Sequence, residues 1–257
     1  MAEGERYVPD WRDAAAYEPL LAADRSLFAW EWLRRDLGYQ TAAERALAGG
    51  SRDPVGPGEG PKRWGLHAFE PPTLTAPEAR PFWRAEVHSF VLGVEARPSD
   101  GEDVFDFERF EAISRALTAD GCERLLFSDG LRSIRIDVLS GTVAEGPVQL
   151  RYRLAGLAAA EPPVLTLRRL LALCRTGGFC RSLHPGEARA RRWLLQLRAH
   201  DALTAGADQR EIASVLLSAE ASEPPWRIRS PSVRSQVQRL VRVARRMPSD
   251  GYFTLLR

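Results

Sequence analysis

The chain has 257 residues, of which 44% are hydrophobic and 27% charged, a composition typical of globular rather than disordered proteins. No apolar run approaches the ~20 residues that a membrane-spanning helix requires. Three cysteines cannot form a disulfide framework, and the polar N-terminus does not resemble a secretory leader. We therefore expect a cytoplasmic protein with reduced thiols and no membrane contact.

Positive charge is concentrated in the C-terminal third, although the whole chain carries only +2. Residues 181–257 contain 14 arginines, no lysine and 7 acidic residues, a net charge of +7, which leaves −5 for the remaining 180 residues. Only one of the 36 basic residues is a lysine, so the clustering of arginine is more informative than its abundance. A basic C-terminal third behind a mildly acidic body is typical of a polyanion-binding module attached to another domain.

Residues 9–48 have a helical pattern. Asp24 or Ser26 is a candidate N-cap for a first helix, which Gly38 would end. A second short helix, TAAERALA, runs into Gly49. Three tryptophans occur by residue 32, which favours a small core or a helix-docking face over an aromatic ligand cage.

A segment rich in glycine and proline follows at residues 49–63 and predicts a linker, where we place the first domain boundary. Beyond it, residues 64–86 are rich in proline and predict an extended connector with one short helix after Pro77. His67 lies in this connector without a matching ligand pattern, so we interpret it as structural.

From Val87 the pattern changes to strands. Ile134, Ile136 and Val138 alternate with charged residues, a period of two that predicts a half-buried antiparallel strand. The turn residues Ser128-Asp129-Gly130 predict a hairpin before this strand. The full set of predicted elements is a strand at 87–96, a helix at 107–118, and strands at 123–128, 131–141 and 147–156. Together they indicate a small α+β unit with an antiparallel sheet.

After a predicted helix at 164–177, residues 187–247 predict three amphipathic helices. In the first of the three, apolar residues supply an inward face: Trp193, Leu194, Leu197 and Leu203. Asp208 is the candidate N-cap of the second, and Glu211 completes a pair typical of a capping box.

The last helix, after Ser230 as N-cap and Pro231 at its first position, carries a dense row of arginines. Its apolar residues fall on one face: Val233, Val237, Leu240, Ala244 and Met247. A helix with one apolar stripe for docking and a basic outer face is suited to a DNA groove. The connection at 218–229 is about three times as long as the turn of ~3–4 residues in a simple helix-turn-helix.

Two other patterns resemble metal sites. The acidic segment at 100–111 would suit a divalent metal for phosphodiester chemistry, but it has no partner motif and is interpreted as a solvated loop. Cys174, Cys180 and His184 lack the short ligand spacing and the fourth ligand of structural zinc. No nucleotide-binding glycine loop or nucleophile elbow occurs, so we expect no enzyme activity, no metal and no cofactor.

Duplex DNA is therefore the expected partner, preferred over RNA because the A-form major groove is too narrow for a helix. Arg234 and Gln238 are candidates for base edges. The remaining candidates for DNA contact, mostly to phosphates, are Gln209, Arg210, Arg227, Arg229, Ser230, Ser232, Arg239, Arg242 and Arg245. Two alternatives stay open: that the arginines only solvate the helix, and that the protein sequesters another regulator without touching DNA.

Residues 201–256 read DALTAGADQREIASVLL…W…SPSVRSQVQRLVRVARRM…DGYFTLL and resemble the C-terminal DNA-binding domain of RovC-like bacterial transcription factors. PDWRDAAAYEPLLAADRSLFAWEWLRRDLGY, continued by WGLHAFEPP and ARPFWRAE, resembles a module that accompanies this domain in proteobacterial regulators. Ser249-Asp250-Gly251-Tyr252 departs from the paired glycines usual before the terminal tyrosine.

The resemblance implies a homo-oligomeric activator of type VI secretion genes or of transfer genes on integrative conjugative elements. RNA polymerase or a second regulatory protein would be a further partner.

The predicted fold class is α+β, with a helical N-terminal segment, a small antiparallel sheet with helices and a helix-turn-helix-like three-helix C-terminal domain. The predicted boundaries are a helical module at 1–48, the linker at 49–63, an oligomerisation or regulatory α+β domain at 64–180 and the DNA-binding domain at 181–257.

Overall fold

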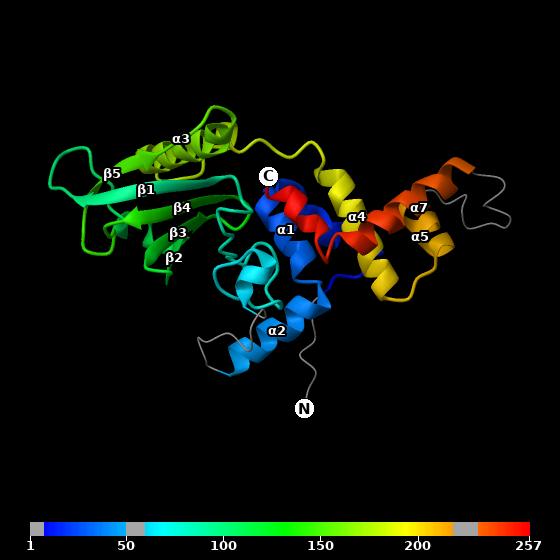
Figure 1. Cartoon of the computed structure of the whole chain (residues 1–257). Coiled ribbons are helices and arrows are strands. Elements are labelled where there is room, and N and C mark those ends of the chain that lie inside the picture. The colour runs from blue at the N-terminus through cyan, green and yellow to red at the C-terminus, as the bar shows by residue number, and fades with distance from the viewer. Residues whose placement is uncertain (1–7, 50–59, 218–230) are drawn as a thin grey trace.

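A computed structural model describes residues 8–49, 60–217 and 231–257. The five-stranded sheet lies at one end of the molecule and the helices α4, α5 and α7 at the other, with α1 and the C-terminus between them (Figure 1). The fold is α+β, as the sequence predicts. In the described residues, no helix combines the length and the hydropathy needed to cross a membrane.

The N-terminal module consists of the 3-10 helix η1 (Ala15–Ala22) and the helices α1 (Arg25–Leu33) and α2 (Leu37–Ala48). Asp24 caps α1, because its carboxylate accepts a hydrogen bond from the Leu27 amide at 3.0 Å. The prediction that Gly38 ends this helix is wrong. Asp36 accepts from the Tyr39 amide and starts α2 there, so Gly38 lies inside the second helix.

The connector begins with the 3-10 helix η2 (Pro61–Trp64), and its predicted helix after Pro77 is only a turn. The Ala79 amide donates to the Thr75 carbonyl at 2.8 Å, but no further turn of helix follows. A short antiparallel bridge between Leu66 and Trp83 then folds the connector back on itself.

The sheet has the strand order β2-β3-β4-β1-β5. Its strands are β1 (Val91–Pro98), β2 (Ser114–Ala119), β3 (Cys122–Ser128), β4 (Ser133–Ser140) and β5 (Val148–Arg153). The predicted helix at 107–118 is wrong in its second half: the 3-10 helix η3 (Glu108–Ile113) passes directly into β2. β2 and β3 form a hairpin across Asp120 and Gly121, both with positive φ, a two-residue turn whose Asp-Gly signal the prediction overlooked.

The central strand β4 differs from the half-buried antiparallel strand that its alternation predicts. It is antiparallel to β3 but parallel to β1, and Arg135 and Asp137 are buried along with its apolar residues. Both faces of the sheet are covered here. The Arg135 guanidinium lies 5.0 Å from the ring centre of Phe82 in the connector and pairs with Asp137 at 2.8 Å.

The helix α3 (Glu161–Thr176) packs its Leu170 and Leu173 into the core on the other face of the sheet. It ends at Gly177 in the left-handed conformation, as predicted, but begins three residues earlier than expected, with both prolines in its first turn. The short 3-10 helices η4 (Ala158–Ala160) and η5 (Arg181–Leu183) flank it.

Among the described residues, three α-helices lie in the predicted segment 187–247: α4 (Ala190–Thr204), α5 (Gln209–Leu216) and α7 (Pro231–Arg246). A last 3-10 helix, η7 (Gly251–Leu255), returns the chain to α1. Val237, Val241 and Ala244 of α7 pack in one core with Ala202 of α4 and Ile212 of α5.

A third hydrophobic core joins the N-terminal module, the connector and the C-terminal segment. The ring centres of Phe28 in α1 and Trp193 in α4 are 5.1 Å apart, in an edge-to-face arrangement. Trp83 of the connector lies 6.0 Å from Tyr252 of η7. Segments from both ends of the chain therefore share one core, and the predicted domain boundaries stay predictions.

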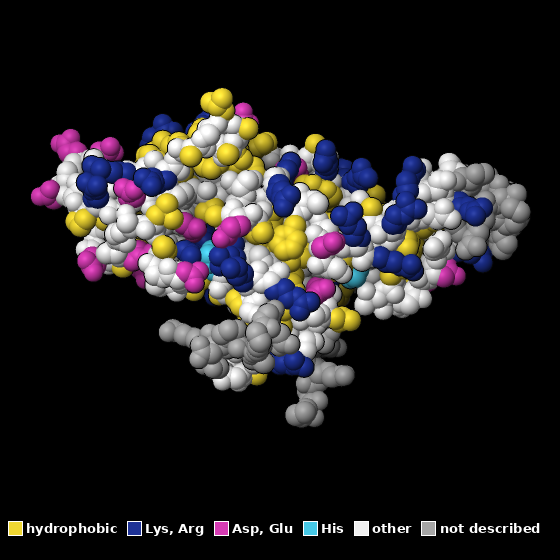
Figure 2. Space-filling view, viewed as in Figure 1, with side chains coloured by type: hydrophobic (Ala, Val, Ile, Leu, Met, Phe, Trp, Pro, Cys, Tyr) yellow, Lys and Arg dark blue, Asp and Glu magenta, His cyan; other side chains and the backbone are white. Residues whose placement is uncertain are grey.

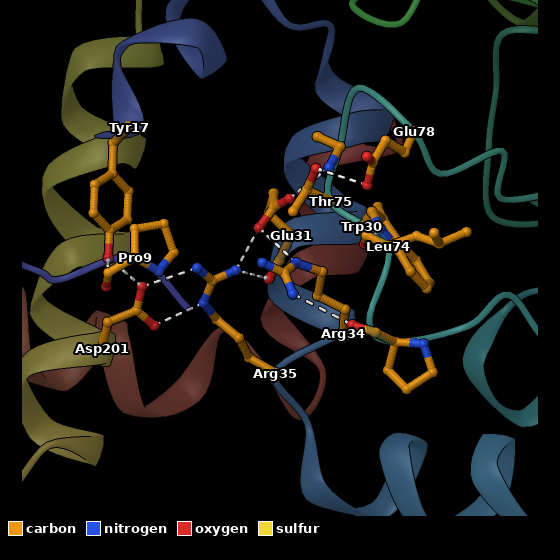
Figure 3. A network of polar contacts seen from close by, with 12 residues as sticks. Pro9, Tyr17, Trp30, Glu31, Arg34, Arg35, Leu74, Thr75, Glu78 and Asp201 are labelled. Carbon is orange, nitrogen blue, oxygen red and sulfur yellow. Dashed lines mark hydrogen bonds and ion pairs between the residues drawn. The ribbon is translucent and has the colours of Figure 1, made fainter. Parts of the chain in front are cut away.

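Buried ion pairs connect α1 to α4 within this core (Figure 3). Arg35 donates two hydrogen bonds to Asp201, at 2.7 and 2.9 Å, and Tyr17 donates a third at 2.7 Å. Burial alone would raise the pKa of Glu31, but the neighbouring Arg35 and Arg34 lower it. The network therefore keeps its charges paired and fixes α4 against the N-terminal module.

Candidate nucleic-acid interface

The helix α7 presents two opposite faces. Val237 and Ala244 are fully buried, Val241 and Met247 nearly so, and the predicted stripe residues Val233 and Leu240 are half-buried. Val241, which the prediction omitted, lies at the edge of this apolar face. All the residues predicted for the basic face are exposed: Arg234, Gln238, Arg239, Arg242, Arg245 and Arg246.

Four of these residues form one stripe along the outer side of α7. Arg234, Gln238 and Arg242 are spaced four residues apart, and Arg245 follows three later, so helical geometry places all four within one turn-to-turn row. Arg239 lies farther around the helix, towards Arg246. Arg234 and Gln238, which are predicted to contact base edges, therefore lie in the same row as Arg242 and Arg245, which are predicted to contact phosphates.

An open hollow of about 600 Å³ lies between this row and the start of α5. Gln209 lines it from α5, and Gln238, Arg242, Arg245 and Arg246 line it from α7. The structure thus brings Gln209 next to the row, as the sequence alone could not show.

The start of α5 is fixed by two contacts. The Asp208 carboxylate accepts from the Glu211 amide at 2.8 Å, which confirms the predicted N-cap. The Glu211 carboxylate pairs instead with Arg12 near the N-terminus, across 199 residues of sequence. Arg210 follows the cap on the exposed side of the helix.

His200 connects the supporting helix α4 to α7. Its Nδ1 lies 3.2 Å from the Ala244 carbonyl, and its ring contacts Trp32 of α1 edge-to-face at 5.8 Å. Burial lowers the pKa of His200 although Asp201 opposes this shift, so the neutral ring is favoured and hydrogen-bonds without adding charge to the interface.

Acidic residues are sparse around this surface, and none lies in α7 itself. Arg246 has Asp250 at 3.6 Å, and both side chains are exposed. Figure 2 shows dark blue side chains over the end of the molecule that carries α4, α5 and α7. Arg246, which the predicted contacts leave out, also lines the hollow. Arg189, Arg191 and Arg192 are exposed at the start of α4, where the helix dipole disfavours positive charge.

The remaining predicted contacts lie before α7 or in its first turn. Arg227, Arg229 and Ser230, with the whole connection at 218–229, lie outside the described residues. Ser232 is exposed in the first turn of α7.

The alternative metal sites do not form clusters. In the residues that the structure describes, no three histidine, cysteine or acidic side chains converge as a metal site would require. Cys174 and Cys180 are free thiols, and His184 packs its ring against Phe179 at 5.6 Å. His67 contacts Arg84 at 3.3 Å, inside the connector.

Comparison with family models gives two matches. Residues 157–257 match a domain described as the DNA-binding domain of a T6SS transcription factor, of the RovC type. Residues 10–67 match a proteobacterial transcriptional regulator-like domain. The chain carries a RovC-type DNA-binding domain behind this regulator-like domain. The RovC-type match begins at Leu157 and so includes α3 as well as α4, α5 and α7.

The comparisons with curated proteins and with solved structures gave no match. The two family models nevertheless cover the same N- and C-terminal arrangement that the sequence resemblance implies. The chain is thus a transcription factor in which α4 of the RovC-type match packs in the same hydrophobic core as the regulator-like domain.

Proposed function

We propose that the protein is a sequence-specific DNA-binding regulator that inserts α7 into the major groove. The observation that carries this proposal is the exposed row of Arg234, Gln238, Arg242 and Arg245 on a helix whose opposite face is buried against α4 and α5. An α-helix fits the major groove, where arginine and glutamine side chains read guanine and adenine edges.

Each part of the surface has its own role in this proposal. Arg234 and Gln238 contact bases, while Arg239, Arg242 and Arg245 contact phosphates. Gln209 and Arg210 contact the DNA backbone from the start of α5, and Ser232 contacts it from the first turn of α7. Arg227, Arg229 and Ser230, outside the described residues, are further candidates for this contact. The buried contacts of α4 with the N-terminal module support α7 from behind, which favours a fixed orientation of the helix.

The finer identity of the regulator belongs to the same proposal. It activates type VI secretion genes, or transfer genes of a mobile element, in the bacterial cytoplasm. It acts as a homo-oligomer, and the sheet unit provides the surface for self-association or for contact with RNA polymerase or a second regulator. The RovC-type match supports the type VI assignment over other regulons.

The test starts with genomic fragments selected by the purified full-length chain. Binding to a selected fragment and to a shuffled duplex is then measured by fluorescence anisotropy between about 50 and 200 mM salt. Arg242→Ala should weaken both complexes and reduce the slope of log Kd against log salt by about 1. Arg234→Ala with Gln238→Ala should reduce the preference for the selected fragment, by about 1–3 kcal/mol for each bidentate base pairing that the substitution removes.

Arg151→Ala is the matched control. Arg151 is an exposed arginine of β5, in the sheet at the other end of the molecule (Figure 1) and outside both matched domains, so both affinity and salt slope should stay at the wild-type values. If the wild-type chain binds no duplex in a salt-dependent manner at low ionic strength, DNA recognition is refuted. The protein-sequestering alternative would then stand.

A further inference from the structure

A pocket of about 270 Å³ lies where the N-terminal module, the sheet unit and the connection to α4 meet. Ser26 at the start of α1 lines one side, and Ser133 at the start of β4 another. Arg169 of α3 and His184, just before α4, complete the wall. Figure 1 shows the chain crossing here from the sheet to the helices of the DNA-binding end.

The pocket contains more positive charge than its own acidic residues neutralise. The Asp24 carboxylate is occupied by the Ser26 and Ser133 hydroxyls, at 2.7 and 2.6 Å, besides its capping bond. Glu187 is bound by both Nε and Nη2 of Arg25. Both acidic residues of the lining are therefore already engaged.

Arg169 lines the pocket and forms an ion pair with neither of these two acidic residues. Its Nε donates to the Leu183 carbonyl at 3.0 Å, and its guanidinium carbon lies 5.8 Å from the ring centre of Phe90. Within the described part of the chain, no carboxylate comes within ion-pair distance of it. Burial lowers the pKa of Arg169, with Asp24 opposing, so a cation is held here in a partly desolvated position.

Three side chains of the pocket lining each carry a buried nitrogen without a partner. His88 is 7% exposed and makes no hydrogen bond to any described residue, and its Nδ1 is buried. The Nδ1 of His184 and the Nε of Arg135 are also buried without a hydrogen bond. Buried groups of this kind cost free energy unless they find a partner, and the three residues that carry them gather around one pocket.

We propose that this pocket binds a small organic anion, a carboxylate or phosphate group carried on an apolar body, as an effector of the regulator. The guanidinium of Arg169 and the imidazoles of His88 and His184 hold the oxyanion, while Phe90 and Leu165 contact the apolar body. The ligand contacts the sheet unit, α1 and the approach to α4 together, so binding stabilises their mutual arrangement. This site does not depend on DNA binding.

Binding is tested on the full-length chain at constant ionic strength, with chloride as the reference anion. Benzoate and phenyl phosphate serve as probes, and their comparison separates a carboxylate site from a phosphate site. Either probe should raise Tm with saturation, whereas chloride should not. Arg169→Gln should weaken binding by about tenfold or more, and Arg168→Gln, which changes the neighbouring exposed arginine, should leave it unchanged.

Nitrogen-15 spectra of the four histidine rings provide a readout that needs no variant. A probe bound beside His88 and His184 should shift their ring resonances, while His200, which lies outside the pocket, should keep its position. Ring signals of His88 and His184 that stay unchanged at saturating concentrations of both probes would overturn the proposal. So would equal affinity of the wild-type chain and a folded Arg169→Gln variant.

Discussion

Asp201 is the residue at which the two ends of the chain depend most directly on each other. It is 4% exposed and accepts hydrogen bonds from Arg35 and Tyr17, which come from the other end of the sequence. Although burial alone would lower the pKa of Arg35, Asp201 and Glu31 raise it, so Arg35 is charged in the folded protein. Asp201→Asn removes the carboxylate that neutralises this buried charge. We expect Asp201→Asn to reduce the free energy of unfolding by about 3–5 kcal/mol, measured by urea denaturation.

Asp250→Asn is the control for this variant. Asp250 also pairs with an arginine, Arg246, but both side chains are about 70% exposed and solvent screens the pair. Its urea midpoint should match that of the wild type. Equal midpoints for Asp201→Asn and Asp250→Asn would show that the buried network contributes nothing to stability.

His88 gives the protein a pH dependence that has a definite sign. Burial, together with Arg135 and Arg169, lowers the pKa of His88 to about 3. In the unfolded chain the imidazole takes up a proton below about pH 6.5, whereas in the folded protein it does not, so stability falls as the pH falls from about 6.5 towards 3. Replacing it by His88→Gln should reduce the loss of unfolding free energy between pH 6.5 and 5 by up to about 2 kcal/mol.

The measurement uses urea denaturation in buffers without carboxylate or phosphate, because these anions would occupy the proposed pocket. At pH 8 the imidazole of His88 is neutral in both states, so the wild type and the variant should show the same pH dependence there. A His88→Gln variant that loses as much stability on acidification as the wild type would contradict the assignment.

At the scale of elements, two glycines with positive φ lie at the ends of strands, and only one of them is in close contact with a neighbouring strand. Gly141, directly after β4, has φ of +77°, and a Cβ there would lie 2.0 Å from the Ala96 carbonyl oxygen of β1. Gly121, in the β2–β3 turn, has φ of +72° but open space around the same position. Substitution of Gly121 would therefore introduce backbone strain alone, whereas substitution of Gly141 would introduce the same strain and a steric clash.

Gly121→Ala should cost about 1–2 kcal/mol of unfolding free energy, the cost of a left-handed conformation. Gly141→Ala should cost clearly more, because the parallel β1–β4 pair must also move apart. Urea denaturation compares the two variants directly. Equal losses would show that β1 is free to give way at Ala96.

At the scale of the whole molecule, the helices α4, α5 and α7 pack around one core, but α4 also lies in the core of the N-terminal module. Trp193 and Tyr252 lie in the core of the N-terminal module, and Arg198 donates to the Trp11 carbonyl at 2.8 Å. We therefore expect an excised segment of residues 181–257 to lose the cooperative unfolding of the full chain. Circular dichroism during urea titration measures this, and a sharp, two-state transition of the excised segment would contradict it.

Particular elements show how far local sequence patterns reach. The three C-terminal helices, the Asp24 and Asp208 caps and the glycine that ends α3 follow from apolar spacing and capping chemistry, which act over a few residues. The strand β2 resembles a helix in sequence because an edge strand with mixed burial has no clear period. Its Asp120-Gly121 turn is the signal that marks it as a strand.

The basic row of α7 could also be predicted, since the residues of one helical face are set by spacing alone. The position of Gln209 beside that row could not be predicted from the sequence, because it depends on how α5 packs against α7. The burial of Arg135 and Asp137 could not be predicted either. Charged residues that alternate with apolar ones along a strand are typical of a solvent-exposed face, but here the connector covers that face.

By itself, the sequence determined the three C-terminal helices, the Asp24 and Asp208 caps, the charged face of α7 and which family domains the chain contains, because these are properties of local order along the chain. Only the tertiary structure decided that α4 packs into the core of the N-terminal module, where Arg35 and Asp201 pair across 166 residues of sequence. It also decided that Arg169, His88 and His184 surround one pocket. Contacts between distant segments depend on packing in three dimensions, and no periodicity in the sequence encodes them.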